Sequence, residues 1–194
     1  ETGENSLEWT SRYGSVVTSA FEIASTDGMN EKGLVANLLW LPETEYPVRD
    51  KNKPGLAITA WVQYMLDNFA TVEEAVAYID EDTFQVVSDM MPDGSRLATL
   101  HLSISDATGD CAIFEYIGGK LTVYHSKEYK VMTNSPTYNK QLALSEYWKS
   151  IGGLSFLPGT NRAADRFARA SFYINALPET DDERIAVASV FSVV

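Results

Sequence analysis

The sequence predicts an α+β fold with mainly antiparallel strands. Two observations carry this prediction: strand-like patterns occur in two groups along the chain, and a pair of helix-like patterns follows each group. Helices that are grouped in this way pack on an antiparallel sheet, whereas parallel sheets need strands and helices in strict alternation. We therefore expect layers, with sheet in the middle.

The first group of strands lies before residue 42. Residues 12–22 are rich in strand-forming side chains, and residues 26–28, Thr-Asp-Gly, have the composition of a turn. Residues 33–41 form a short apolar run between a glycine and a proline, which predicts a buried strand. Residues 42–54 contain three prolines and are expected to form a loop.

A pair of helices is expected next. Apolar residues at the spacing i, i+3, i+4, i+7, i+8 and i+11 lie on one helical face. They are Ile58, Trp61, Val62, Met65, Leu66 and Phe69. The sequence Thr-Val-Glu-Glu at residues 71–74 has the pattern of a capping box, so a second helix should begin there. Its predicted inward side chains are Val72, Ala75, Val76 and Ile79.

The second group of strands reads as a β-meander. Residues 98–105 alternate apolar and polar side chains, which predicts a strand with one buried face and His101 on its polar face. Residues 106–110 turn the chain into a strand at residues 111–117. The Gly118–Gly119 pair predicts a hairpin, with a returning strand at residues 121–124.

The last third is expected to be helical. Residues 162–177 are amphipathic, and Pro178 ends that helix. A second capping-box pattern, Thr-Asp-Asp-Glu at residues 180–183, predicts a helix over residues 184–194. That helix ends apolar, without a polar tail, so we expect the chain to stop inside a larger fold. The length predicts a single domain over residues 1–194.

Composition excludes several classes of partner. The net charge is −12 and the pI is about 4.5, and no dense basic patch could replace counterions on nucleic acid or bind an anionic membrane. We expect the acidity to serve solubility. No apolar run approaches the roughly 18 residues that predict a membrane span, so no membrane partner is expected.

Metal and cofactor sites are not expected. The chain has one cysteine and two histidines, and none of them stands at the spacing of zinc ligands. Carboxylates alone could still hold calcium. Cys111 opens an apolar strand, which favours a structural role over a reactive one. His101 and His125 could each act as a base, but no Gly-x-Ser-x-Gly sequence supplies a serine nucleophile.

Asn134 and Arg166 leave alternatives open on physical grounds. Asn134 follows an apolar strand end and precedes Ser135-Pro136, where the chain must turn. Its amide could donate to an oxyanion, or it could bind its own backbone in an Asx-turn. Arg166 could hold a thiolate or a carboxylate, or it could lie on a solvated helix face.

Three segments stand out when they are taken together. They are Asp-Gly-Met-Asn-Glu-Lys-Gly-Leu at residues 27–34, Val-Met-Thr-Asn-Ser-Pro at residues 131–136, and Leu-Pro-Gly-Thr-Asn-Arg-Ala-Ala-Asp-Arg-Phe at residues 157–167. In this combination they resemble the choloylglycine hydrolase family, which comprises penicillin V acylases and bile salt hydrolases. The resemblance implies an αββα sandwich of the N-terminal nucleophile hydrolase type. This chain would be its central portion, incomplete at both ends.

The resemblance also implies a chemistry, the hydrolysis of linear amide C–N bonds. Family members use an N-terminal cysteine whose α-amino group acts as the base, and the pKa of such an amine lies near working pH. This chain begins at Glu1, so the implied nucleophile is absent from it. The alternative is a catalytically inactive fragment or relative that only binds amphipathic acyl ligands.

Three residues carry over from the family as catalytic groups. Asn134 matches the asparagine whose side chain donates to the oxyanion, and Arg166 matches the arginine near the nucleophile. Trp40 stands where a backbone N–H completes the oxyanion hole, and its large indole suggests a pocket for an apolar or aromatic acyl group.

The implied partner is a small-molecule amide: penicillin V, a conjugated bile salt or an N-acyl homoserine lactone, which the sequence does not rank. Residues 139–156 form a shorter link than in Gram-positive members, where an insertion grips a neighbouring subunit. The chain therefore resembles the Gram-negative branch, which implies a periplasmic location, with the cytoplasm as the alternative. A homo-oligomer stays open, without the usual tetramer contact.

Overall fold

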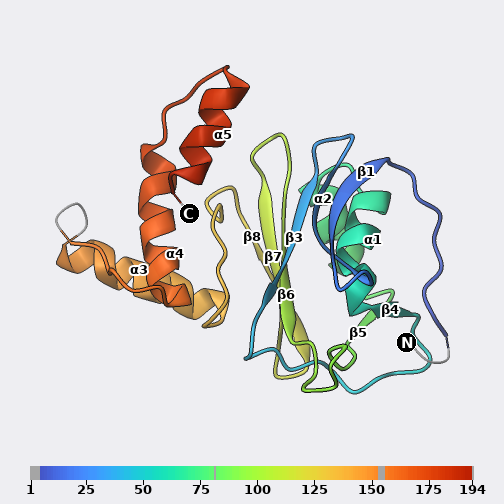
Figure 1. The fold of residues 1–194 in the computed structure, drawn as a ribbon. Coiled ribbons are helices and arrows are strands. Elements are labelled where there is room, and N and C mark those ends of the chain that lie inside the picture. Colours follow the sequence, from blue (N-terminus) through green and yellow to red (C-terminus); the bar gives the residue numbers. More distant parts are fainter. Residues whose placement is uncertain (1–4, 81, 153–155, 194) are drawn as a thin grey trace. The chain divides into compact units, whose positions relative to one another are not determined.

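The computed structural model describes residues 5–80, 82–152 and 156–193 (Figure 1). The chain forms two compact units, which we describe separately. We call Glu1–Tyr129 the sheet unit and Lys130–Val194 the helical unit. The single domain over residues 1–194 stays a prediction.

One antiparallel sheet dominates the sheet unit. Its six strands have the order β1-β2-β3-β6-β7-β8, which is their order along the chain. Between β3 and β6 the chain leaves this sheet to form helices and a separate pair of strands. The strands are β1 (Ser15–Ala20), β2 (Ala24–Asn30), β3 (Val35–Trp40), β6 (Leu100–Ser105), β7 (Cys111–Ile117) and β8 (Lys120–His125). The predicted mixture of helices with an antiparallel sheet is confirmed.

Helices α1 (Trp61–Asn68) and α2 (Val72–Asp80) pack on one face of this sheet, behind β1 and β3 in Figure 1. The predicted apolar face of the first helix is confirmed, because all six of its residues are at most 6% exposed. The capping box is confirmed as well. The Thr71 hydroxyl accepts from the Glu74 N–H, and the Glu74 carboxylate accepts from the Ala70 N–H.

A short parallel pair, β4 (Gly55–Ala57) and β5 (Gln85–Val87), was not predicted. Each strand has three residues, which is too short for a periodic pattern to stand out in the sequence. The 3-10 turn Ile58–Ala60 joins β4 to α1.

The predicted turn at residues 26–28 is wrong, because these residues lie inside β2. The chain instead turns at residues 21–23, where Phe21 and Glu22 have positive φ angles of 54° and 59°. Gly28 serves close packing rather than a turn. A Cβ there would lie 2.7 Å from the Val16 carbonyl oxygen and 2.8 Å from a methyl carbon of Leu66, so no larger residue fits.

Asn30 ties the end of β2 to the end of α1. Its side chain is 3% exposed, and its Nδ2 donates to the carbonyl oxygens of Leu66 and Phe69, both at 2.8 Å. Its Oδ1 accepts from the N–H groups of Lys32 and Leu34 at 3.0 Å. Helix ends leave carbonyls without partners inside the helix. Asn30 therefore caps α1 from a distant strand, which explains part of the motif at residues 27–34.

We expect Asn30→Ala to lower the free energy of unfolding by about 2–3 kcal/mol, because the buried carbonyls of Leu66 and Phe69 would lose their donor. Urea unfolding measures this loss. The matched control is Asn68→Ala, which removes a single partly buried bond to the Tyr64 carbonyl and should change stability by less than about 1 kcal/mol. Equal losses in the two variants would contradict the capping role of Asn30.

His101 is not on an exposed polar face, as the alternation had predicted, but is fully buried. Its Nδ1 lies 2.9 Å from the Glu115 Oε1, and neither side chain is exposed. The two residues face each other across β6 and β7, since the register pairs Leu102 with Phe114. A carboxylate on the neighbouring strand is therefore what makes a buried histidine tolerable here.

The helical unit contains α3 (Tyr138–Ile151), α4 (Ala163–Tyr173) and α5 (Glu183–Phe191), with a 3-10 turn at Ile174–Ala176. The link predicted at residues 139–156 is thus largely helix. The predicted cap of the last helix needs correction. The N-cap residue is Asp182, not Thr180, and the Asp182 side chain accepts from the N–H groups of Arg184 and Ile185. A carboxylate at this position also complements the helix dipole.

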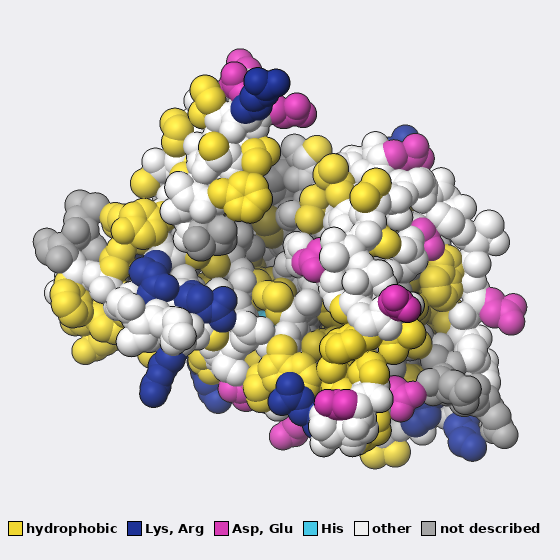
Figure 2. Space-filling view, in the orientation of Figure 1, with side chains coloured by type: hydrophobic (Ala, Val, Ile, Leu, Met, Phe, Trp, Pro, Cys, Tyr) yellow, Lys and Arg dark blue, Asp and Glu magenta, His cyan; other side chains and the backbone are white. Residues whose placement is uncertain are grey.

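Hydrophobic side chains are exposed along α5, as Figure 2 shows on the segment drawn red in Figure 1. Ile185, Val187, Val190 and Phe191 are each at least 50% exposed. No helix among the described residues is long and apolar enough to cross a membrane.

Candidate active site

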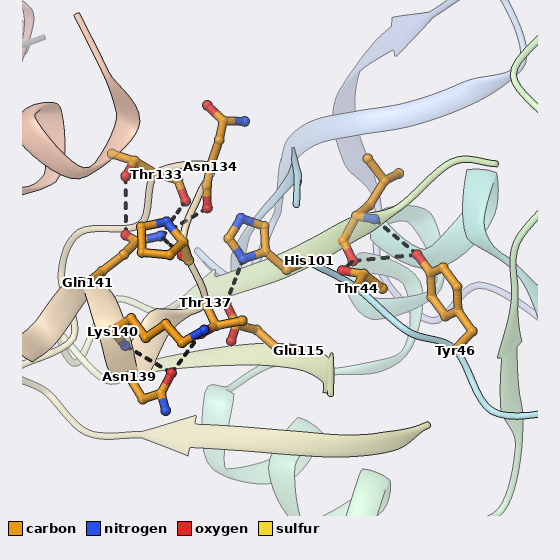
Figure 3. A network of polar contacts seen from close by, with 12 residues as sticks. Thr44, Tyr46, His101, Glu115, Thr133, Asn134, Thr137, Asn139, Lys140 and Gln141 are labelled. Atoms are coloured by element: carbon orange, nitrogen blue, oxygen red, sulfur yellow. Dashed lines mark hydrogen bonds and ion pairs between the residues drawn. The ribbon is translucent and has the colours of Figure 1, made fainter. Parts of the chain in front are cut away.

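A buried glutamine holds the loop that carries Asn134 (Figure 3). Gln141 on α3 is fully buried, and its Nε2 lies 3.0, 2.9 and 2.6 Å from the carbonyl oxygens of Thr133, Asn134 and Pro136. The Thr133 hydroxyl lies 3.1 Å from the Gln141 Oε1 and 2.9 Å from the Ala163 carbonyl oxygen. The loop backbone is therefore fixed from two helices, α3 and α4.

Arg166 orients the Asn134 side chain. Its Nη2 donates to the Asn134 Oδ1 at 2.9 Å, and its Nε donates to the Asn161 carbonyl oxygen at 3.2 Å. A guanidinium can only donate, so the amide atom facing it must be the oxygen. This places the N–H groups of Asn134 on the other side of its amide, and Figure 3 shows that side chain directed away from Gln141. A fixed amide donor is what an oxyanion site needs.

Neighbouring residues hold the loop before α4 in place. Arg169 donates to the carbonyl oxygens of Pro158 and Thr160 at 2.8 and 2.7 Å. The Thr160 hydroxyl lies 2.5 Å from the Asp165 carboxylate and accepts from the Arg162 N–H at 3.2 Å. The motif at residues 157–167 is thus a loop held by its own hydrogen bonds, followed by the first turn of α4. These bonds fix the start of α4, which carries Arg166.

Trp40 ends β3 in the sheet unit, where the ladder determines the direction of its backbone N–H. Trp40 lies opposite Leu100, and the next N–H, that of Leu41, donates to the Thr99 carbonyl oxygen at 2.9 Å. Hydrogen-bonded and non-hydrogen-bonded pairs alternate in antiparallel sheets. The Trp40 N–H is therefore directed away from β6, as a donor to an oxyanion would have to be.

Side chains complete the ladder opposite Trp40. The Leu100 N–H donates to the Tyr46 hydroxyl at 3.1 Å, and the Thr44 hydroxyl donates to the Leu100 carbonyl oxygen at 3.1 Å. Burial raises the pKa of Tyr46 to about 12, so this phenol stays protonated at neutral pH. These contacts fix the end of β6, and with it the strand that carries Trp40.

Neither Cys111 nor the histidines form a triad-like arrangement in the described residues. Cys111 is 7% exposed and begins β7, which agrees with the structural role expected for it. His125 binds Asp110 through its Nε2 at 2.8 Å, and His101 binds Glu115. No cluster of at least three potential metal ligands occurs among the described residues.

The structure brings two of the three predicted site residues together. Asn134 and Arg166 are in contact within the helical unit, and Trp40 belongs to the sheet unit. Sequence reasoning missed Gln141, whose role depends on three carbonyl groups that the loop aims at it. It also missed Arg96, whose guanidinium carbon lies 3.9 Å from the centre of the Trp40 indole. Neither residue stands in a pattern that could have revealed it.

Comparisons with known proteins identify the family and agree with the fold. Residues 7–194 match the model of the family described as "Linear amide C-N hydrolases, choloylglycine hydrolase family". A penicillin V acylase from Pectobacterium atrosepticum is 59% identical over 179 residues, which cover 89% of this chain and 48% of that protein. A bile salt hydrolase/transferase from Clostridium perfringens is 30% identical over 190 residues, covering 86% of this chain and 57% of that protein.

Solved structures of the same two kinds of enzyme are also similar to this chain. The penicillin V acylase from Agrobacterium tumefaciens matches with a TM-score of 0.91 and 57% identity, over 100% of this chain and 58% of that one. A mutant of the conjugated bile acid hydrolase from Clostridium perfringens matches with a TM-score of 0.76 and 28% identity, over 99% of this chain and 67% of that one.

The fold is thus that of the N-terminal nucleophile hydrolases. Within that class, the chain belongs to the choloylglycine hydrolase family of linear amide C–N hydrolases. It spans about half the length of the curated relatives it matches, 48% and 57% for the two described above.

Proposed function

We propose that the protein hydrolyses linear amides of the penicillin V type, with conjugated bile salts as weaker alternatives. The observation that carries the proposal is the contact between Asn134 and Arg166. It fixes the orientation of the Asn134 amide, so that the amide N–H groups can donate to an oxyanion. Two relatives named penicillin V acylase, at 59% and 57% identity, support this substrate class over the bile salt class at 30%.

In the proposed mechanism the nucleophile is the cysteine at the N-terminus of the mature protein, outside residues 1–194. Its α-amino group takes the thiol proton, and the sulfur attacks the amide carbonyl. Asn134 Nδ2 and the Trp40 backbone N–H donate to the resulting oxyanion. Arg166 holds the Asn134 amide and supports the thiolate electrostatically. The amine leaves with a proton, and water then hydrolyses the thioester.

The same proposal includes a location and a substrate pocket. The indole of Trp40 is half-buried, which suits an aromatic acyl group such as phenoxyacetyl. We place the protein in the periplasm, on the basis of its resemblance to the Gram-negative branch. The proposal allows a homo-oligomer. Such an oligomer would lack the subunit contact that the insertion of the Gram-positive members makes.

The test combines an intact mass spectrum of the complete gene product with a substrate panel. We expect an N-terminal cysteine in the mature protein and the release of 6-aminopenicillanic acid from penicillin V. Release of glycine or taurine from conjugated bile salts should be slower. If penicillin V binds but no amide is cleaved, the protein is a binding relative and the proposed hydrolysis is wrong.

A further inference from the structure

A cavity of about 430 Å³ lies within the sheet unit. Its walls come from α1, the end of α2, β5, β7, β8 and the loop of residues 47–53. Its volume falls within the range of about 300–1,000 Å³ that small-molecule sites occupy. None of the three residues assigned to the candidate active site, Asn134, Arg166 and Trp40, lines it. The cavity is therefore a candidate site for a further ligand.

The cavity exists because the helices cover the sheet incompletely at β8. Tyr116 on β7 lies opposite Leu121 on β8, and Val123 follows two positions later on the same face. The ring centres of Tyr116 and Trp61, the first residue of α1, are 6.1 Å apart, so this is the face on which α1 packs. Helix α1 packs mainly on β2 and β3, however. Leu121 and Val123 consequently stay half-buried, and both line the cavity.

The lining is mostly apolar, and its charges are balanced. Aromatic and aliphatic side chains from both layers line it, among them Trp61, Phe84, Tyr116, Ile79 and Val86. The ionic side chains in the lining are Asp50, Asp82, Lys53 and Lys120. Lys53 and Asp82 pair with each other. Two positive and two negative groups produce no net attraction for an anion or a cation, so the lining suits an uncharged ligand.

One buried polar atom in this lining has no partner among the residues that the structure describes. It is the Nε1 of Trp61, a side chain that is 1% exposed. Gln85, also in the lining, is satisfied, because it accepts from the Asp50 N–H at 2.8 Å and donates to the Val48 carbonyl oxygen at 3.0 Å. A buried indole N–H usually has an acceptor, and leaving it without one costs free energy. A ligand with an oxygen atom can supply that acceptor.

We infer that the cavity is a binding site for an uncharged ring compound that accepts a hydrogen bond from the Trp61 indole. The apolar walls bury the ring, and a carbonyl or ether oxygen accepts from the Nε1. The inference does not depend on the proposed hydrolysis, because it involves neither Asn134 nor Arg166. It gives the protein a second ligand besides the amide substrate.

The experiment compares two compounds of similar size, by calorimetric titration of the complete gene product. Acetophenone has a carbonyl oxygen, and ethylbenzene has none. We expect acetophenone to bind about fivefold more tightly, the effect of one neutral hydrogen bond. Trp61→Phe keeps a ring but removes the N–H, so it should weaken acetophenone about fivefold and change ethylbenzene by less than about twofold. Equal affinities of the two compounds for the wild type would overturn the inference.

A cavity-filling variant tests the location. Val123→Phe adds a ring inside the cavity, on a strand where aromatic residues are well tolerated, and should abolish binding of both compounds. The matched control is Ala77→Phe, which adds the same ring at an exposed position of α2 outside the lining. It should leave both affinities within about twofold, and a thermal melt shows whether each variant is folded. Wild-type affinity in folded Val123→Phe would mean that the compounds bind elsewhere, which contradicts the inference.

The indole N–H provides a second readout that does not need the cavity-filling variant to fold. Each tryptophan labelled with ¹⁵N gives one indole N–H signal, and the signal that Trp61→Phe removes is that of Trp61. Saturating acetophenone should move this proton signal downfield, as expected for a newly formed hydrogen bond, and ethylbenzene should move it less. A Trp61 signal that acetophenone leaves in place would show that the indole is not the donor, and the inference would be wrong.

Discussion

Asn134→Ala is expected to lower turnover of penicillin V by about 10²–10³ in the complete gene product, with little change in KM. The reason is that an oxyanion donor acts mainly on the transition state, and losing one costs roughly that factor. The alanine also leaves the Arg166 guanidinium without its acceptor 2.9 Å away. Steady-state kinetics with a thermal melt of each variant provide the measurement.

Asn134→Asp is the matched control, because it separates donation from orientation. An aspartate keeps an acceptor for Arg166, so the loop and the melt should be preserved. It has no N–H to donate and brings a negative charge toward the oxyanion, so its turnover should be at least as low as that of Asn134→Ala. A fully active Asn134→Asp enzyme would rule out Asn134 as the oxyanion donor.

Glu115→Ala is the substitution with the largest expected effect on stability. It removes the partner 2.9 Å from the His101 Nδ1 in a place where neither side chain is exposed. Breaking a buried pair typically destabilises a protein by about 3–5 kcal/mol, because the remaining polar group stays buried without compensation. Urea unfolding should show this loss as a lower midpoint at an unchanged slope.

The double substitution His101→Phe with Glu115→Leu tests the explanation. Replacing both members of a buried pair by apolar residues is often close to neutral, so the double variant should be more stable than Glu115→Ala. Glu115→Gln keeps an acceptor for the His101 Nδ1 and should lose less than Glu115→Ala. A double variant as unstable as Glu115→Ala would show that packing volume, not the pair, explains the loss.

Several elements were predictable because their signal is local. The six apolar residues from Ile58 to Phe69, in and beside α1, stand at helical spacing, and the apolar run that contains β3 is bounded by a glycine and a proline. In β2 the local signal was misleading, because Thr-Asp-Gly has the composition of a turn but lies inside the strand. Gly28 is there because β1 and Leu66 leave no room for a side chain, and no pattern within β2 can reveal that.

The family motifs located the candidate site, but they could not give its geometry. Asn134 and Arg166 are 32 positions apart in the chain, and the sequence contains nothing that states which amide atom faces the guanidinium. The hydrogen bonds from Gln141 to three carbonyl oxygens depend on the path of the backbone through residues 133–136. The predicted roles of Asn134, Arg166 and Trp40 remain for kinetics to test.

By itself, then, the sequence determined which segments are amphipathic, where most helices begin, and which family the motifs belong to. These properties depend on residues within a few positions of each other, where periodicity and capping operate. Only the tertiary structure decided the long-range contacts of polar side chains: the buried ones of His101 with Glu115 and of Asn30 with the end of α1, and the exposed one of Asn134 with Arg166. The physical reason is that strand register and helix packing determine which polar side chains meet, and the two partners lie far apart in the chain.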